Sequence, residues 1–388
     1  MNYSQEDYSL LAPGPVNLHP EVRKALSLPM IHHRTPEFDR IFKKVLTRMK
    51  PIFQTKQDVF LLSCTGSGGM EALLVNTLSA GDKVISINTG KFGERWGEMA
   101  TVFGADVIAV EVPWGEPVSV LEIEELLKKD PKIKAIFCQA CETSTGVRNP
   151  IEELGKLIHG YPDTLFFVDA ITALGAYPIK MDEWHIDGLV AGSQKAFMLP
   201  TGMAFVALSE KAWRFVDSAT TPRFYFDLRK EKKANSNGET FYSSNVSIIR
   251  ALDVVLDLID KQGLEGLFHD IHRRAEFTRL FSQKLGFTLY AKTPSDSVTA
   301  LLVPPSMDGQ KIRLYLEQEH KITIMGGQDQ AKGKIIRIGH MGYIQDGELV
   351  KLIKCLGMTL HHFDPEAYSL EQVTTVTQES KRYLELNP

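Results

Sequence analysis

Residues 165–195 read LFFVDAITALGAYPIKMDEWHIDGLVAGSQK and contain the two side chains on which the interpretation of this chain depends. The apolar run that starts at Leu165 ends in a carboxylate, Asp169, and a second run from Gly188 is followed by an amine, Lys195. Both runs have the length and composition of buried strands. In an open α/β sheet, ligands bind outside the carboxyl ends of the strands, which is where these two side chains are expected to lie.

A lysine and an aspartate at such positions, 26 residues apart, suit pyridoxal 5'-phosphate (PLP). This cofactor needs an amine to hold it as a Schiff base and a carboxylate to keep its pyridine nitrogen protonated. Each residue alone also fits a plainer role, as a solvated lysine or as the cap of a following turn. The other motifs of the chain therefore have to show whether these two residues form a cofactor site.

Composition places the chain among globular proteins. With 388 residues, 43% of them hydrophobic and 24% charged, it can bury a large core and is expected to form two domains. A net charge of −4 provides no basic surface for nucleic acid or for an anionic membrane. Small molecules are therefore the expected partners.

The N-terminal stretch Met1–Asp7 lacks the charge and apolar core of a secretory signal, and no apolar run approaches the roughly 20 residues of a membrane span. A cytoplasmic location is expected. The four cysteines are too few for a disulfide framework, and Cys138 and Cys141 lack the further ligands that zinc requires. We therefore expect reduced thiols and no metal site.

Short apolar runs alternate with segments of helical spacing, which indicates an α/β domain with a mostly parallel sheet of seven strands. The first six expected strands are Val59–Ser63, Lys83–Asn88, Val107–Val112, Ile133–Cys138, Leu165–Asp169 and Gly188–Ser193. Only nine residues, Gln194–Gly202, separate the last of these from Met203–Ser209. A parallel crossover needs about a dozen or more, so the seventh strand is expected to run antiparallel to the sixth.

A long helix is predicted over Asn245–Gln262, ended by Gly263. Beyond it, strands and helices mix as in a smaller α+β domain, so the expected domains are 1–264 and 265–388, with a terminal helix within 365–386. The strands expected in the smaller domain are Phe287–Ala291, Ser297–Val303, Ile322–Met325 and Ile335–His340, and its helices lie near Gly309–Gln318 and Glu348–Leu356. The charged segment Arg229–Asn237 is expected to be a mobile loop.

Two glycine-containing turns follow the first two strands. Cys64–Glu71 places glycines and hydroxyls before a helix, where free N–H groups and the helix dipole favour a phosphate. Its spacing differs from the dinucleotide and P-loop patterns, and a tight turn without a ligand is the alternative. In the second turn, Phe92 stands between Gly90 and Gly93 and could stack on a planar ring, or simply belong to the core.

In their order along the chain, these motifs resemble the class V PLP-dependent aminotransferases, especially the alanine/serine–glyoxylate (serine–pyruvate) group. The resemblance covers about residues 9–358 and implies the PLP-dependent transferase fold of type I. It rests on Leu11–Pro15, Thr65–Glu71, Gly90–Arg95, Glu142–Gly146, Val168–Ala170, Gly192–Lys195 and Arg337–Gly339.

The resemblance also implies roles for single residues. Lys195 would bind the cofactor as a Schiff base, Asp169 would pair with the pyridine nitrogen, and Phe92 would stack on the ring. Thr143 would lie near the ring hydroxyl, and Ile171 would pack on the opposite ring face. The residues that would hold the phosphate are Thr65, Gly66, Ser67 and Gln194.

Thr240 and Ser243 match family residues that reach the phosphate bound to a neighbouring subunit, which implies a homodimer with shared sites. The chain departs from the family pattern here, because Phe241 and Ser244 stand where the family commonly has prolines. The geometry of these two contacts is therefore open.

Arg337 lies in an alternating strand pattern that would point it into the cleft if Ile336 and Ile338 face the core. A guanidinium pairs with a carboxylate through two charge-assisted hydrogen bonds, and amino acids and 2-oxo acids both carry that group. The resemblance assigns Arg337 this role and has Gly14 line the substrate pocket through its backbone. A surface arginine is the plainer alternative.

The predicted function is transamination, from alanine or serine to a 2-oxo acid such as glyoxylate or pyruvate. Lys195 would move the proton at the substrate α-carbon after the substrate displaces it. Other donors, an aminophosphonate or ureidoglycine, remain open. Cysteine desulfuration would need a reactive thiol, whereas Cys355 lies in an apolar helix pattern. A non-catalytic subunit that keeps the fold is the alternative from a different class.

Overall fold

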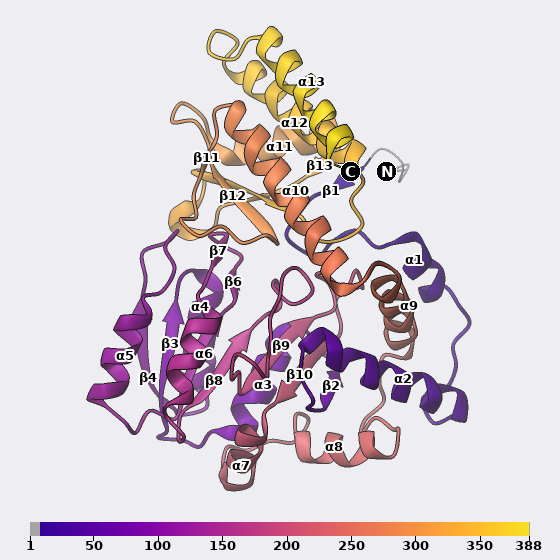
Figure 1. Ribbon diagram of the computed structural model, residues 1–388, viewed down its shortest axis with the longest axis vertical. Helices are drawn as coiled ribbons and strands as arrows, with labels where there is room; N and C mark the ends of the chain where they lie inside the picture. Colours follow the sequence, from indigo (N-terminus) through magenta and orange to yellow (C-terminus); the bar gives the residue numbers. More distant parts are fainter. Residues whose placement is uncertain (1–7, 388) are drawn as a thin grey trace.

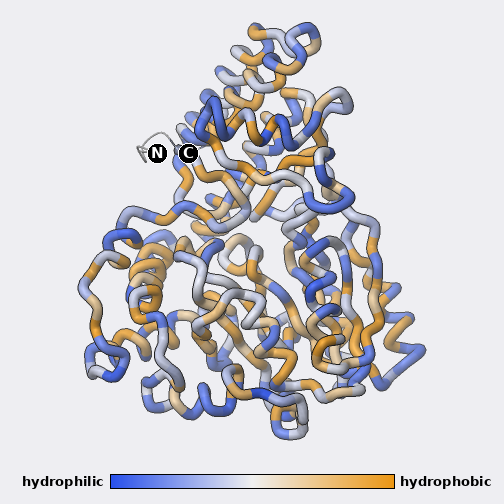
Figure 2. The backbone as a smooth tube through the Cα atoms, turned by 180° about the vertical axis from the view of Figure 1, so that it is seen from behind, coloured by the Kyte–Doolittle hydropathy of each residue, from blue (hydrophilic) through white to orange (hydrophobic). Residues whose placement is uncertain are grey.

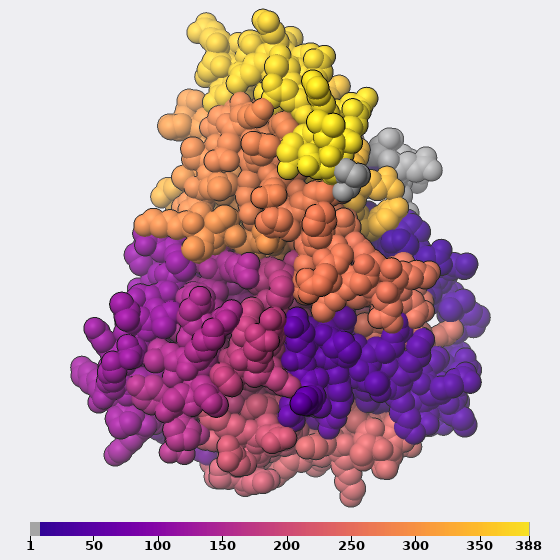
Figure 3. Space-filling model, in the orientation of Figure 1, coloured from indigo at the N-terminus to yellow at the C-terminus, as the bar shows by residue number. Residues whose placement is uncertain are grey.

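A computed structural model describes residues 8–387; the stretch Met1–Asp7, discussed above, lies outside these residues. A broad lower part holds the long central sheet, and a narrower part made mainly by the C-terminal third stands on it (Figure 1). In the space-filling view the terminal helix covers the outer face of this upper part (Figure 3). Hydrophobic segments gather in the central strands, while many peripheral segments are hydrophilic (Figure 2).

The central sheet has seven strands in the order β2-β10-β9-β8-β5-β3-β4. Only β10 runs antiparallel to its neighbours, which confirms both the mostly parallel sheet and the antiparallel seventh strand. The strands are β2 (Val59–Leu62), β3 (Lys83–Asn88), β4 (Asp106–Glu111), β5 (Ala135–Gln139), β8 (Leu165–Asp169), β9 (Gly188–Gly192) and β10 (Ala204–Leu208).

Successive residues of a strand point to opposite faces of the sheet, and each face has its own core. In β5, Ile136 and Cys138 join one apolar cluster, whereas Ala135 and Phe137 join the other. The helices of this part are α1 (Pro20–Leu26), α2 (Pro36–Phe53), α3 (Gly66–Thr77), α4 (Lys91–Val102), α5 (Val120–Lys129), α6 (Ile151–His159), α7 (Glu210–Ser218), α8 (Leu228–Ser236) and α9 (Val246–Gln262).

The prediction of a mobile loop over Arg229–Asn237 is wrong, because these residues form most of helix α8. Asp227 caps the helix by accepting a hydrogen bond from the backbone N–H of Arg229. Leu228 and Glu231 are buried, which ties the helix to the rest of the protein. The charged composition of the segment gave no sign that these two residues are buried.

The C-terminal part has a four-stranded antiparallel sheet in the order β11-β12-β15-β14. Its strands are β11 (Thr288–Leu289), β12 (Val298–Leu302), β14 (Met325–Gly326) and β15 (Ile335–Gly339). Its helices are α10 (Leu264–Lys284), α11 (Gly309–His320), the 3-10 turn η1 (Asp329–Ala331), α12 (Asp346–Phe363) and α13 (Leu370–Leu386), so the expected terminal helix is confirmed.

The single strand expected over Ile322–Met325 is divided in two. Its first half, β13 (Ile322–Thr323), pairs with the N-terminal strand β1 (Ser9–Leu10), and its second half is β14. The N-terminal segment thus crosses to the C-terminal part, while the boundary near residue 264 stays a prediction. A two-stranded ribbon, β6 (Cys141–Glu142) and β7 (Val147–Arg148), lies where the two parts meet. Within residues 8–387, no helix is long and apolar enough to cross a membrane.

Candidate active site

Lys195 follows β9 at its carboxyl end, and it is partly buried. Its Nζ donates a hydrogen bond to the carbonyl of Pro13 at 2.7 Å. Burial lowers the pKa of Lys195 from 10.5 to about 8, and the positive charge of Arg337 acts in the same direction. About one tenth of such an amine is neutral at pH 7, against less than about a thousandth of an ordinary lysine. The residue is therefore suited to nucleophilic attack on an aldehyde.

Gly14 makes the contact with Lys195 possible. A Cβ atom at this position would lie 2.3 Å from Nζ of Lys195, and the backbone φ of +130° is one that side chains rarely adopt. The expected place of Gly14 against the substrate pocket fits this geometry.

Asp169 ends β8, the strand next to β9, and is 7% exposed. Burial raises the pKa of Asp169 to about 6, and the nearby negative charge of Glu142 adds to this, whereas Arg95 and Lys195 oppose it. The N–H of Ile171 donates to Oδ1 of Asp169 at 2.8 Å. Among the described residues no donor is recorded on Oδ2, so this oxygen is available to a cationic partner.

The turn before α3 forms an anion cradle. Thr65 is the N-cap residue, yet its side chain makes no capping hydrogen bond, and the first N–H groups of a helix have no partner within the helix. Gly66 packs so closely on Ile171 that a Cβ would lie 2.3 Å from its Cδ1. Ser67 accepts a hydrogen bond from Arg95 Nη1 at 3.2 Å.

Arg95 links this cradle to Phe92. Its guanidinium carbon lies 5.1 Å from the centre of the Phe92 ring while its Nη1 reaches Ser67. Arg95 lies within the Gly90–Arg95 motif, but the sequence predicts no role for it. No sequence signal distinguished it from a surface arginine on α4.

Arg337 joins the two parts of the protein. Ile336 and Ile338 lie in the apolar cluster of the C-terminal part, so Arg337 points the other way, as the alternation predicted. Its Nε donates to Gly326 O and its Nη1 to Thr143 O, both at 2.9 Å. Burial lowers the pKa of Arg337 to about 10, so the guanidinium is still charged at pH 7.

Within residues 8–387, no acceptor is recorded for Nη2 of Arg337. Thr143 itself lies in the turn between β6 and β7, and its hydroxyl is 2.8 Å from that of Thr172. Thr172 was not singled out from the sequence, although it directly follows Ile171.

Gln194 and the Thr240–Ser243 segment are the remaining residues that were expected at the phosphate. Oε1 of Gln194 is buried without a hydrogen-bond partner, as expected of a side chain that faces a polar ligand. Thr240 is buried and donates to Tyr242 O at 2.6 Å, whereas Ser243 is exposed. The adjoining Ser244 hydroxyl is 3.3 Å from that of Ser63, just before the cradle.

All four cysteines are free thiols. Cys138 and Cys355 are buried in β5 and α12, as expected of Cys355, and burial raises the pKa of both thiols. Cys141 is buried against Ser297. The described part of the chain contains no group of three or more His, Cys, Asp or Glu side chains that could hold a metal ion.

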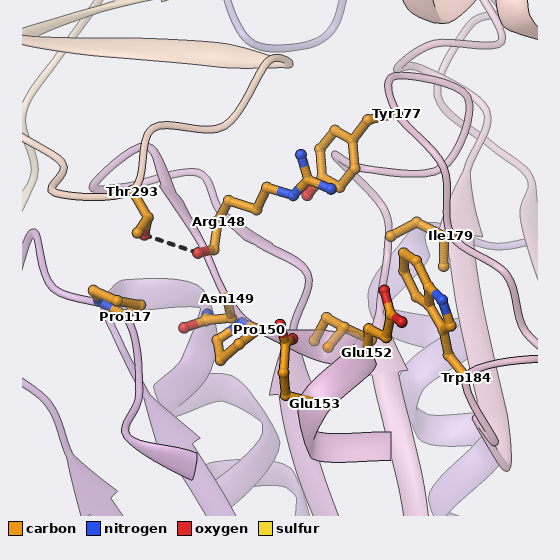
Figure 4. A pocket seen from close by; sticks show the side chains of 11 residues that line it. Pro117, Arg148, Asn149, Pro150, Glu152, Glu153, Tyr177, Ile179, Trp184 and Thr293 are labelled. Carbon is orange, nitrogen blue, oxygen red and sulfur yellow. Dashed lines mark hydrogen bonds between the residues drawn. The ribbon is translucent and has the colours of Figure 1, made fainter. Parts of the chain in front are cut away.

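A separate pocket of about 330 Å³ opens beside β7 and α6 (Figure 4). Arg148 lies over the ring of Tyr177, 4.3 Å from its centre, and its carbonyl accepts a hydrogen bond from Thr293. Neither Lys195 nor Asp169 lines this pocket. It is therefore distinct from the site described above.

Comparison with known proteins identifies the family. Residues 21–349 match the family model described as "Aminotransferase class-V". The chain belongs to the class V aminotransferases. Members of this family are PLP-dependent, so this chain is a PLP-dependent aminotransferase, as its motifs predicted.

Two curated relatives and one solved structure illustrate the similarity. The soluble hydrogenase small subunit of Synechococcus sp. is 35% identical, with 92% of this chain and 94% of that protein covered. The L-aspartate–glyoxylate aminotransferase of Paracoccus denitrificans is 38% identical, with 87% of each covered. The alanine–glyoxylate aminotransferase of Nostoc sp. is 28% identical with a TM-score of 0.88, covering 93% of this chain and 97% of that one.

The residues at the site fit PLP. The unpartnered Oε1 of Gln194, the uncapped start of α3 and the free oxygen of Asp169 are polar groups that a phosphorylated pyridine would satisfy. Gly14 and Gly66 allow the side chains of Lys195 and Ile171 to approach the backbone more closely than a Cβ atom would permit. The donor set therefore agrees with the family's cofactor.

Proposed function

We propose that this enzyme moves an amino group from a small amino acid, alanine or serine, to a 2-oxo acid, glyoxylate or pyruvate. The observation that carries the proposal is Arg337, a buried charged guanidinium that contacts Thr143 at the junction of the two parts. Among residues 8–387, its Nη2 has no recorded acceptor and could bind a substrate carboxylate. It supplies the carboxylate recognition that both substrates require.

PLP supplies an electron sink for the bond at the substrate α-carbon when it is bound. Lys195 would hold the cofactor and, once displaced, carry the proton between the α-carbon and the cofactor. Asp169 would keep the pyridine nitrogen protonated, and Arg337 would orient the substrate. Phosphate contacts would come from Thr65, Gly66, Ser67 and Gln194, with ring contacts from Phe92, Ile171 and Thr143.

A panel of amino donors against glyoxylate and pyruvate tests the proposal. The solved relative named above is an alanine–glyoxylate enzyme and the Paracoccus relative an aspartate–glyoxylate enzyme, so glyoxylate is the acceptor that the two names share. Aspartate belongs in the panel for that reason. Turnover of alanine or serine with glyoxylate supports the proposal, and turnover of aspartate, ureidoglycine or an aminophosphonate alone would replace its donor.

A relative that is named a hydrogenase subunit raises the question of a non-catalytic role. The presence of Lys195, Asp169 and Arg337 together argues against that role in this chain. Absorbance of the purified protein that borohydride bleaches would argue further against it. The free cysteines support a reducing, cytoplasmic compartment.

Arg337→Ala is expected to lower kcat/KM for alanine or serine by about ten- to a hundredfold, because a hydrogen bond to a charged group is lost. PLP absorbance should hardly change. The control substrate is an amine without a carboxylate, whose slow half-reaction should be indifferent to the substitution. Equal losses for both substrates would show that Arg337 only supports the structure through Thr143 and Gly326.

We further propose a homodimer in which each subunit completes the other's site. Exposed aromatic side chains surround the Thr240–Ser243 segment: Phe224 is 74% exposed, Tyr225 45% and Phe241 39%. Tyr225 and Tyr242 stack with ring centres 4.8 Å apart, and Lys230 lies over Phe224 and Phe241. A cluster of exposed aromatics of this kind is typical of a protein interface.

Mixing two inactive variants tests the shared site. Lys195→Ala chains and chains with Thr240→Ala and Ser243→Ala should together regain activity, because one of the two sites in a hybrid dimer is intact. Subunit exchange is checked with differently tagged chains. Proven exchange without any regained activity would rule out sharing through these two residues.

A further inference from the structure

Glu142 is a buried carboxylate close to the residues of the site. It is 0% exposed, and four hydrogen-bond donors surround it. Phe92 N and Gly93 N donate to Oε2 at 3.1 and 2.9 Å, while the N–H and hydroxyl of Ser144 donate to Oε1 at 3.0 and 2.6 Å. Two of these donors belong to the first turn of α4, which lies 49 residues or more away along the chain.

Helix α4 has no capping side chain of its own. Its N-cap residue is Gly90. The N–H of Lys91 donates a hydrogen bond to the Ser144 hydroxyl at 3.0 Å. Glu142 and Ser144 therefore accept hydrogen bonds from the first N–H groups of α4. In most helices a serine or aspartate at the N-cap position has this role. A carboxylate at this end also interacts favourably with the helix dipole.

Gly90 permits this arrangement. A Cβ atom there would lie 2.6 Å from Cγ of Glu142 and 2.3 Å from Oγ of Ser144. The first glycine of the Gly90–Gly93 turn thus serves the approach of Glu142 rather than the approach of a ligand.

Other groups of the site are coupled to the same carboxylate. The next residue, Thr143, offers its carbonyl to Arg337. The negative charge of Glu142 raises the pKa of both Asp169 and Arg337. Burial raises the pKa of Glu142 itself, while its four donors favour the ionised form. No other described carboxylate accepts hydrogen bonds from both Phe92 and Gly93.

We infer that Glu142 is a positioning residue: by capping α4 from outside, it fixes Phe92 against the place where the cofactor ring binds, and it joins that wall to Arg337. The inference rests on the proposed function. Glu142 touches neither cofactor nor substrate and acts through Phe92 and Thr143.

Glu142→Ala and Glu142→Gln test the inference, with Asp187→Asn as the matched control. Asp187 is a second buried carboxylate, which accepts hydrogen bonds from Phe166 N and Ser209 Oγ. Asp187 precedes β9 and Lys195 follows β9, so the two residues lie at opposite ends of this strand. Its loss is expected to weaken the fold without reaching the site.

Three readouts separate positioning from general stability: the Kd of the apoprotein for PLP, the circular dichroism of bound PLP, and hydrogen exchange of residues 91–94. Glu142→Ala should raise the Kd about tenfold or more, weaken the cofactor dichroism and expose the amides of Phe92 and Gly93. Glu142→Gln keeps one acceptor oxygen and should restore the amide protection and part of the affinity. Asp187→Asn should change only the unfolding temperature.

If Glu142→Ala fails to fold, Glu142→Gln tests the positioning role instead. A Kd for PLP and a cofactor dichroism equal to those of the wild type in that variant would overturn the inference. Equal losses in Asp187→Asn would also overturn it. A wild-type chain that binds PLP but transaminates none of the donors removes the proposed function and leaves the positioning role standing. A wild-type chain that takes up no PLP overturns both.

Discussion

Replacement of Lys195 by alanine should abolish covalent capture of PLP and lower kcat by at least about 10⁴-fold, because both the Schiff base and the proton-carrying amine are lost. The fold should survive. In the folded protein the pKa of Lys195 is lowered to about 8, below its unfolded value of 10.5. Burial therefore costs stability while the amine is charged, and this cost disappears as the pH rises from about 8 to above 10.5.

At pH 7 the apo Lys195→Ala protein is accordingly expected to unfold at the same temperature as the wild type, or at a higher one. Thermal unfolding followed by circular dichroism checks this, and absorbance before and after borohydride checks the loss of the covalent cofactor. Lys83→Ala is a suitable control, since Lys83 pairs with Asp130 at the other end of β3. A borohydride-reducible chromophore that persists in the Lys195 variant would contradict the assignment.

Asp169→Asn should retain bound PLP but lower kcat by about ten- to a thousandfold, the range that loss of a charged partner brings through a pKa change of 1–3 units. An amide can still accept the hydrogen bond from the N–H of Ile171, so the local backbone should be kept. It cannot favour a protonated pyridine nitrogen as an anion does.

The measurements for Asp169→Asn are kcat and the Kd for PLP. Asp187→Asn again serves as the control, because it removes a buried carboxylate at the amino end of β9, whereas Asp169 lies at the carboxyl end of β8. Turnover near that of the wild type in the Asp169 variant would refute its pairing with the pyridine nitrogen. Loss of PLP binding without loss of fold would assign Asp169 to affinity rather than to the reaction.

The elements that could be predicted are those whose pattern is local. The strands around Leu165–Asp169 and Gly188–Gly192 lie close to their expected bounds, because a buried strand is an uninterrupted apolar run. The helix over Val246–Gln262 has its cap, period and stop within one segment. Helix α8 differs from its predicted loop, since Leu228 is buried in an apolar cluster with residues of β2 and α3, and Glu231 is buried as well.

The sequence by itself determined the α/β class, the antiparallel seventh strand and the set of residues at the strand ends, because periodicity and connection length depend only on neighbours in the chain. Tertiary structure alone decided that β1 pairs with β13, that Arg337 donates to Thr143, 194 residues away, and that Glu142 caps α4. A carboxylate that serves another segment's backbone leaves no periodic trace, since its partners are N–H groups that every residue type except proline carries.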